Sequence, residues 1–97
     1  MTTLHIVRQS AFTSDDFAQC LQVLRNNDVI VFIDDGCYNL HHSLINTIDS
    51  AAEIQLKVIE KHAKARAVTI DETQYSVINM SNLVELTLTT NRVITWQ

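Results

Sequence analysis

The sequence predicts a three-layer α/β domain in which helices flank a mostly parallel sheet of about five strands. Short apolar or β-branched runs alternate with helix signals along the whole chain, as in folds built from strand–helix–strand units. Residues Val29–Ile33 are all apolar, which is typical of a strand buried on both faces of a parallel sheet. The chain has 97 residues, of which 46% are hydrophobic and 19% charged. This length and composition predict one globular domain over residues 1–97.

The first predicted elements are a strand and a helix. Thr3–Arg8 is short and rich in β-branched residues, which favours a strand. Residues 14–16, Ser-Asp-Asp, then supply an N-cap and first-turn acids that suit the positive end of a helix dipole. The apolar face of this helix has the spacing i, i+3, i+4 and i+7 and consists of Phe17, Cys20, Leu21 and Leu24.

The middle of the chain predicts a buried strand and a weaker helix. Val29–Ile33 ends at the turn residues 34–36, Asp-Asp-Gly, where the only glycine of the chain is expected to adopt a left-handed conformation. Leu40 and Leu44 are four residues apart, which predicts a helix from Cys37 to about Thr47.

The rest of the chain continues the alternation of strands and helices. Trp96 is expected to anchor the last strand by packing. The predicted elements are a strand at Ile54–Ile59, a charged helix at Glu60–Ala67, a strand at Tyr75–Met80, a helix capped by Ser81 and a strand at Arg92–Trp96.

The composition excludes several kinds of chemistry. One glycine and no proline rule out a dinucleotide-binding glycine motif, a phosphate-binding P-loop and a nucleophile elbow, because each needs at least two glycines. A formal net charge of −4 lacks the basic footprint of an unaided nucleic-acid binder, so no direct DNA binding is expected. The first residues carry no apolar leader, and no run approaches the roughly 20 residues that cross a bilayer. We therefore expect a cytoplasmic protein with no membrane contact.

The two cysteines are the first candidates for chemistry, because a thiolate is the only strong nucleophile in this sequence. Cys20 is either a persulfide carrier, which accepts a sulfane sulfur and passes it to another thiolate, or a packing residue beside Phe17. Cys37 is either a reactive thiol at the carboxyl end of a strand, where ligands gather in open α/β sheets, or a small residue that fills a turn. Its neighbours Asp34 and Asp35 are expected to raise its pKa. In a reducing compartment both thiols are expected to be free.

Basic and imidazole side chains give weaker signals. The adjacent His41 and His42 point about 100° apart on a helix and cannot both face one metal ion, so we predict no metal and no cofactor. Four of the seven basic residues form a run that is either a patch for RNA or an acidic partner or, more commonly, a solvated helix face. These residues are Lys57, Lys61, Lys64 and Arg66, and the three lysines would share a face if the helix began early.

Four segments, in this order, carry a family resemblance. Residues 4–12, Leu-His-Ile-Val-Arg-Gln-Ser-Ala-Phe, look like a first strand followed by a Ser-x-Phe bend. Residues 31–38 look like an apolar strand that ends in Asp-Gly and a small or aromatic pair. Residues 83–87 and the closing Trp96 look like a terminal helix and a last tryptophan. Together they resemble the TusB/DsrH family of small sulfur-relay subunits over nearly the whole chain. One departure is Ala67, where the family often has glycine.

The resemblance implies a single DsrEFH-like domain with flavodoxin-like topology and no cofactor. It also implies a heterohexamer with two copies each of this chain and of two related small subunits, one TusC/DsrF-like and one TusD/DsrE-like. In such complexes sulfur moves as a cysteine persulfide from a donor protein to an acceptor enzyme that 2-thiolates the wobble uridine of tRNA, and this subunit is not expected to contact tRNA directly. The principal acceptor cysteine lies on another subunit. Some DsrH members have a first-helix cysteine, matched here by Cys20, as a proposed second persulfide site.

Several functional alternatives follow. The chain takes part chemically through Cys20, or it is a structural docking subunit whose cysteines only pack. The relay serves tRNA thiolation, or it serves dissimilatory sulfur oxidation as in the DsrH branch. A stand-alone α/β dimer unrelated to sulfur is the remaining alternative.

Overall fold

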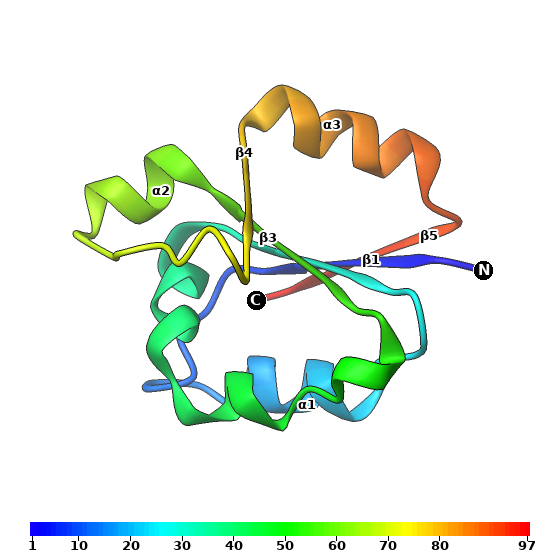
Figure 1. Ribbon diagram of the computed structural model, residues 1–97, viewed down its shortest axis with the longest axis horizontal. Coiled ribbons are helices and arrows are strands. Elements are labelled where there is room, and N and C mark those ends of the chain that lie inside the picture. Colours follow the sequence, from blue (N-terminus) through cyan, green and yellow to red (C-terminus); the bar gives the residue numbers. More distant parts are fainter.

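The computed structural model describes residues 1–97 and contains one sheet of five parallel strands (Figure 1). The strands lie in the order β4-β3-β2-β1-β5. Each of the five predicted strands is confirmed, with ends that differ by at most a few residues. Their bounds are β1 Thr3–Val7, β2 Val29–Phe32, β3 Gln55–Ile59, β4 Ser76–Ile78 and β5 Arg92–Trp96.

Helices cover both faces of the sheet, which confirms the three-layer α/β class. Helix α1 and the 3₁₀ segments lie against one face, α3 lies against the other, and α2 lies beyond the end of β3 (Figure 1). None of the helices combines the length and the apolar composition needed to cross a membrane. The bounds are α1 Asp16–Gln22, η1 Asp34–His41, η2 Ser43–Thr47, η3 Ser50–Ala52, α2 Glu60–Ala65 and α3 Met80–Thr89.

Two apolar cores, one on each side of the sheet, hold these layers together. On the α1 side, Phe32 of β2 makes edge-to-face ring contacts with Phe17 and Tyr75, at centroid distances of 5.6 Å and 6.4 Å. On the α3 side, Val31 packs in the same cluster as Leu83. Strand β2 therefore supplies alternate residues to both cores, which explains why Val29–Ile33 has no polar position.

The strand order corrects one detail of the expected topology. A flavodoxin-like sheet has the order 2-1-3-4-5, whereas here β1 lies between β2 and β5 and the chain advances steadily outward from β1 to β4. The helix α3 then carries the chain back across the sheet to β5 on the far side of β1 (Figure 1). Sequence periodicity gives the type of each element but not the neighbour that each strand pairs with, so this detail was wrong.

The predicted helix from Cys37 to Thr47 is also wrong, because the segment forms two separate 3₁₀ turns. The Asn39 side chain donates to the Gln9 carbonyl oxygen at 3.0 Å and accepts from the Ala11 backbone N–H at 2.7 Å. At His42 the backbone is extended, and Nδ1 of this residue accepts from the Leu44 N–H at 3.0 Å. Side chains that bond to nearby backbone in this way compete with a continuous α-helix.

Helix α3 begins two residues earlier than predicted. Asn79, not Ser81, is the N-cap: its side chain accepts from the Asn82 N–H at 2.9 Å, and the Asn82 side chain accepts from the Asn79 N–H at 3.0 Å. This is a reciprocal capping box made by two asparagines. Ser81 lies inside the first turn and is exposed.

Candidate functional site

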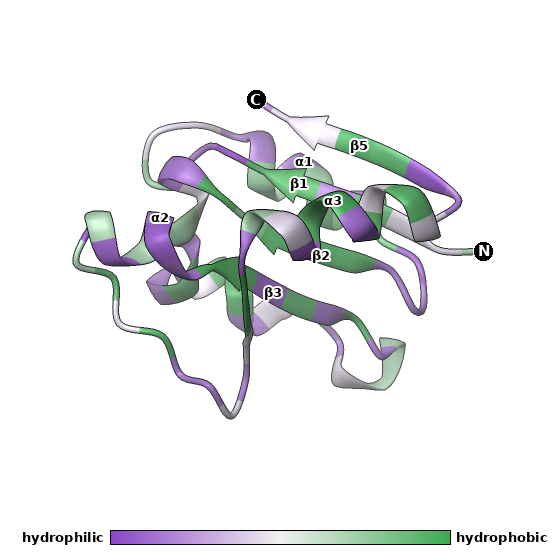
Figure 2. Cartoon of the chain, turned by 90° about the horizontal axis from the view of Figure 1, so that it is seen from above, coloured by the Kyte–Doolittle hydropathy of each residue, from purple (hydrophilic) through white to green (hydrophobic).

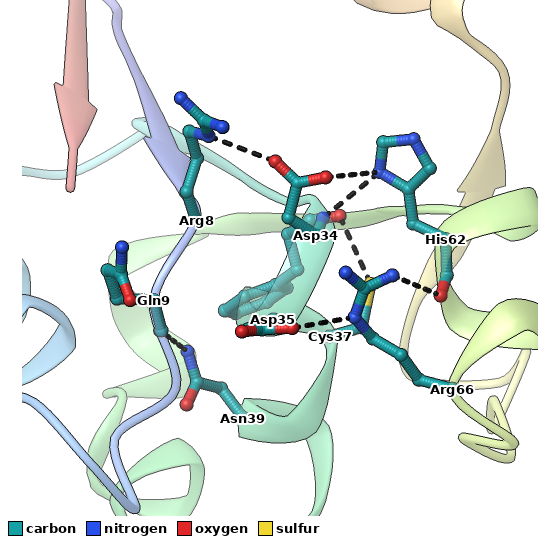
Figure 3. Close-up of polar contacts among 9 residues, drawn as sticks. Arg8, Gln9, Asp34, Asp35, Cys37, Asn39, His62 and Arg66 are labelled. Atoms are coloured by element: carbon teal, nitrogen blue, oxygen red, sulfur yellow. Dashed lines mark hydrogen bonds and ion pairs between the residues drawn. The ribbon is translucent and has the colours of Figure 1, made fainter.

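Charged residues meet at the carboxyl edge of the sheet, just beyond β1, β2 and β3 (Figure 3). Arg8 follows β1, Asp34 begins the segment after β2, and His62 lies in α2 directly after β3. Arg8 donates from Nε to Oδ2 of Asp34 at 3.0 Å and from Nη1 to Oε1 of Gln97 at 2.7 Å. The Asp34 backbone N–H donates to Nδ1 of His62 at 3.0 Å. Ligands bind at this edge in open parallel sheets. The cluster is therefore the first candidate site.

Asp34 adopts a backbone conformation that is uncommon for a residue with a side chain. Its φ is 49°, in the left-handed region, and Arg8 and His62 hold it there from two sides. Since a backbone N–H can only donate, Nδ1 of His62 must be the unprotonated nitrogen in this arrangement. Aspartate is one of the residues that adopt this conformation most readily, because its short polar side chain can hydrogen-bond locally.

Gly36 is required for a different reason from the one predicted. Its φ is not positive; instead, a Cβ at this position would lie 2.0 Å from the Val7 carbonyl oxygen. The Gly36 N–H donates to the Arg8 carbonyl oxygen at 3.1 Å, which holds the segment after β2 against the end of β1. The left-handed residue of the turn is Asp34, two positions earlier.

An ion pair closes the cluster on the α2 side. Nε of Arg66 donates to Oδ1 of Asp35 at 2.9 Å, and Nη1 donates to the His62 carbonyl oxygen at 3.2 Å. Arg66 thus has a fixed structural role. The helix does not begin early enough for the three lysines to share a face, because Lys57 lies in β3 and α2 begins only at Glu60.

Cys37 lies beneath this cluster, but its sulfur is not accessible from it. Its side chain is fully buried, and Sγ contacts the Phe32 carbonyl oxygen at 3.8 Å. Burial raises the pKa of Cys37 to about 11; the Arg66 charge lowers it in part, while Asp34 and Asp35 raise it, as expected. At neutral pH the group is a thiol and not the thiolate that nucleophilic chemistry requires.

Cys20 lies in α1 with its side chain fully buried against the sheet, in the same core as Phe17. Burial raises its pKa to about 12, and the Asp28 carboxylate adds to this shift. Both cysteines are free thiols. A persulfide role for Cys20 stays a prediction, and it would require α1 to expose the sulfur.

A buried polar chain that the sequence did not reveal lies toward the amino end of the sheet. Nε2 of His5 lies 3.0 Å from Oδ2 of Asp28, and the Trp96 indole N–H donates to Nδ1 of His5 at 3.1 Å. His5 and Asp28 are only 1% and 2% exposed. Because Nδ1 accepts, His5 carries its proton on Nε2 and donates it to Asp28. Trp96 therefore anchors β5 by this bond as well as by the packing that was predicted.

Asp28 is ionised in spite of its burial. Burial opposes ionisation, but hydrogen bonds from the His5 side chain and from the Thr3 and Arg25 backbone N–H groups outweigh it and hold the pKa of Asp28 below its usual value. Because this carboxylate accepts from three donors, it is fully hydrogen-bonded within the buried network. The pairing of Leu4 with Val29 brings Thr3 and His5 close to Asp28 across the sheet.

The paired histidines have separate structural contacts. Nε2 of His41 lies 2.9 Å from the Thr69 carbonyl oxygen, and His42 caps the η2 turn through Leu44. Arg8 and His62 were missed as members of the carboxyl-edge cluster. The signal for Arg8 was present, since it is the last residue of the predicted strand Thr3–Arg8. The position of His62 depends on the direction in which α2 leaves β3.

Comparison with known proteins defines the class. Residues 9–93 match the family model described as DsrH like protein, so the chain belongs to the DsrH-like family, as the TusB/DsrH resemblance indicated. Membership in this family makes the chain a subunit of the sulfur-relay type.

A solved structure supports the same fold. The crystal structure of the ychN protein from E. coli is similar to this chain with a TM-score of 0.75, over 98% of this chain and 99% of that one. Its sequence identity is 16%, so the likeness concerns the fold alone. No curated protein sequence matches this chain significantly.

Proposed function

We propose that this chain is a docking subunit of a persulfide-relay complex that supplies sulfur for 2-thiolation of the wobble uridine in tRNA. In this role it holds partner subunits in place, and the sulfur passes over cysteines of those partners. The observation that carries the proposal is a contrast: both thiols are fully buried, while α3 presents an unpaired apolar stripe to solvent.

The thiols support the docking role through their chemistry. Persulfide transfer needs a thiolate that a partner's sulfur can reach. Cys20 and Cys37 are inaccessible, and their pKa values, about 12 and about 11, keep them protonated at neutral pH. Neither group meets either requirement in this conformation.

The apolar stripe lies along the outer flank of α3. Leu83 is buried against the sheet, whereas Met80, Val84 and Leu88 are 50%, 56% and 80% exposed. These three residues are spaced i, i+4 and i+8, so they share one side of the helix. Val93 of β5 is also exposed and lies on the same face of the sheet as α3, because it pairs with Leu4 of the α3-side core. Figure 2 shows α3 and β5 from this side.

The occupant that we propose for this stripe is one of the two related small subunits of the relay complex. Contiguous exposed apolar residues on a small chain mark protein interfaces. A 97-residue chain has a marginal core and gains stability when such surface is buried in an oligomer.

Two lysines placed in the stripe test this role. Val84→Lys/Leu88→Lys puts charges where a partner would desolvate them, so we expect loss of assembly with the related subunits while the isolated chain keeps its circular dichroism spectrum. Native mass spectrometry of the tagged protein from its own host measures the assembly. Thr89→Lys is the matched control, because this exposed residue lies on the opposite flank of α3, near Lys57 and Glu85.

The same host tests the chemical alternatives. If the gene is deleted, we expect the 2-thiouridine content of tRNA, measured by nucleoside mass spectrometry, to fall. Cys20→Ser should restore it as well as the wild type does. Failure of Cys20→Ser with intact assembly would establish a persulfide role for Cys20. Unchanged tRNA thiolation in the deletion strain would instead favour the branch of dissimilatory sulfur oxidation.

A further inference from the structure

We propose that the free edge of β5 and the groove beneath it bind an extended, acidic segment of a partner polypeptide, which adds to the sheet as a sixth strand. The inference rests on the proposed docking function, but it uses a different surface from the α3 stripe. The added strand would carry carboxylates on one side and apolar residues on the other.

The outer edge of β5 is open for strand addition. β5 is last in the strand order, so only its β1 side is paired. The Trp96 carbonyl oxygen accepts from the Arg8 N–H at 3.1 Å and therefore points toward β1. Alternate residues of a strand direct their backbone groups to opposite edges, so Val93 and Thr95 direct theirs outward.

This edge lacks the usual protection against pairing. Natural edge strands are shortened, charged or interrupted by proline. β4, at the other edge, has only three residues. β5 has five residues, no proline and a single charge at Arg92. An unprotected edge of this length is a template for a further strand.

A cationic groove of about 380 Å³ lies on the α1 side of β5. Arg92 and Ile94 of β5 form one wall, Val23 and Arg25 form the other, and the buried His5–Asp28 pair lies at the base. Arg25 and Arg92 are exposed and have no carboxylate partner.

The charge of the groove is only partly offset from within, because the ionised Asp28 at its base is one negative charge against two arginines. Asp28 already accepts from Thr3, His5 and Arg25 backbone or ring N–H groups and is 2% exposed, so it leaves both guanidinium groups unpaired. The chain as a whole has a formal net charge of −4, which makes this local positive charge distinctive. Guanidinium groups at such a site recognise carboxylates.

The strand geometry predicts the pattern of the segment. Side chains of Arg92 and Ile94 face the groove, whereas Val93 faces the α3 side. A sixth strand would place its alternate side chains beside the two arginines, where acids are favoured. The intervening side chains would lie next to Val93, where apolar residues are favoured.

A peptide titration of the full 97-residue chain tests the proposal. The probe is the acetylated, amidated peptide Glu-Val-Glu-Val-Glu, followed by ¹⁵N–¹H NMR. We expect saturable shifts of the Val93 and Thr95 amides, and a dissociation constant about fivefold weaker or more for Arg25→Gln/Arg92→Gln. Lys61→Gln/Lys64→Gln removes the same charge from exposed α2 positions and should bind as the wild type does.

Several results would overturn the proposal. They are absence of saturable shifts at millimolar peptide, equal binding of Gln-Val-Gln-Val-Gln, or equal weakening by the two lysine substitutions. Concentration-dependent shifts of the β5 amides without peptide would show that a second copy of this chain takes the edge. Assembly through α3 is measured separately by native mass spectrometry, so a negative titration leaves the proposed function standing.

Discussion

At the scale of single residues, two aspartates organise opposite ends of the sheet. Asp28 lies at the amino end, where it gathers three N–H donors in the core. Asp34 lies at the carboxyl end, where Arg8 and His62 fix it in a left-handed conformation. The donors matter most at Asp28, because a buried ionised carboxylate is stable only when nearby donors replace water, whereas Asp34 is 36% exposed and keeps contact with water.

Asp28→Asn tests the buried network. An amide cannot accept from all three donors, so we expect the free energy of unfolding at pH 7 to fall by about 1.5–3 kcal/mol. Chemical denaturation measures this. Asp15→Asn is the control, since Asp15 is exposed and its side chain caps nothing, and it should change stability by less than about 0.5 kcal/mol.

The pH dependence of stability gives the same test a second readout. The pKa of Asp28 is lower in the folded chain than its ordinary value, so its contribution is fully present above that ordinary value. The contribution is lost as the pH falls from about 4 through the folded pKa. Asp28→Asn should lack this acid-dependent component. If Asp28→Asn kept the wild-type dependence of stability on pH, Asp28 would not be the group responsible for it.

At the scale of secondary-structure elements, the ends of α2 and α3 show what the sequence could and could not predict. The sequence predicted both helices and the first residue of α2, Glu60, but cap geometry decided where α2 ends and where α3 begins. The Ser81 prediction failed because an Asn79–Asn82 pair caps α3 better than a lone serine does. The Cys37–Thr47 prediction failed because leucine spacing says nothing of the contacts that Asn39 makes with another loop.

The end of α2 explains how alanine can stand at position 67, where the family often has glycine. The Val68 N–H donates to the Ala63 carbonyl oxygen at 2.9 Å and the Ala67 N–H donates to the Lys64 carbonyl oxygen at 3.1 Å, which together form a Schellman motif. Ala67 has a φ of 54°, so the turn keeps the conformation that glycine favours, with an alanine in it.

Ala67→Gly should therefore stabilise the chain. Glycine relieves the left-handed strain, and the gain is partly offset by its greater freedom in the unfolded chain, so we expect about 0.5–1 kcal/mol. The midpoint of thermal unfolding measures it. Ala65→Gly makes the same substitution at the last residue of α2, where φ is negative, and should destabilise by up to about 0.5–1 kcal/mol; equal signs for the two variants would refute the explanation.

The capping box of α3 can be tested in the same way. Asn79→Ala removes one side of the reciprocal pair, and we expect a loss of about 1 kcal/mol in the free energy of unfolding. Ser81→Ala should leave stability within about 0.5 kcal/mol of the wild type, because Ser81 lies inside the helix and is exposed. The opposite order of these two effects would restore Ser81 as the cap.

At the scale of the whole molecule, the fold class was predictable and the candidate sites were not. Five strand-like runs and one fully apolar strand specify a parallel sheet covered on both faces. The His5–Asp28–Trp96 chain joins residues 23 and 91 positions apart, so it exists only once the strand order and register are known. The cationic groove depends on the same order, since it needs β5 beside β1.

The whole molecule also unites the two proposed surfaces. The α3 stripe lies on one face of the sheet and the β5 edge runs beside it (Figure 2), while the groove of the β5 site opens on the α1 side. Both thiols lie in the core on the other face, beneath α1 and η1. This division of roles, with surfaces that dock and sulfurs that pack, is the central claim about the chain.

Native mass spectrometry of the sulfur-loaded complex from its own host, with each subunit then released and weighed, tests this claim most directly. The claim predicts an assembly several times the 11.0 kDa of this chain that contains two other small subunits. It also predicts that this subunit has its unmodified mass and that the added sulfur is on a partner. A lone monomer or homodimer, or an added sulfur atom on this chain, would contradict it.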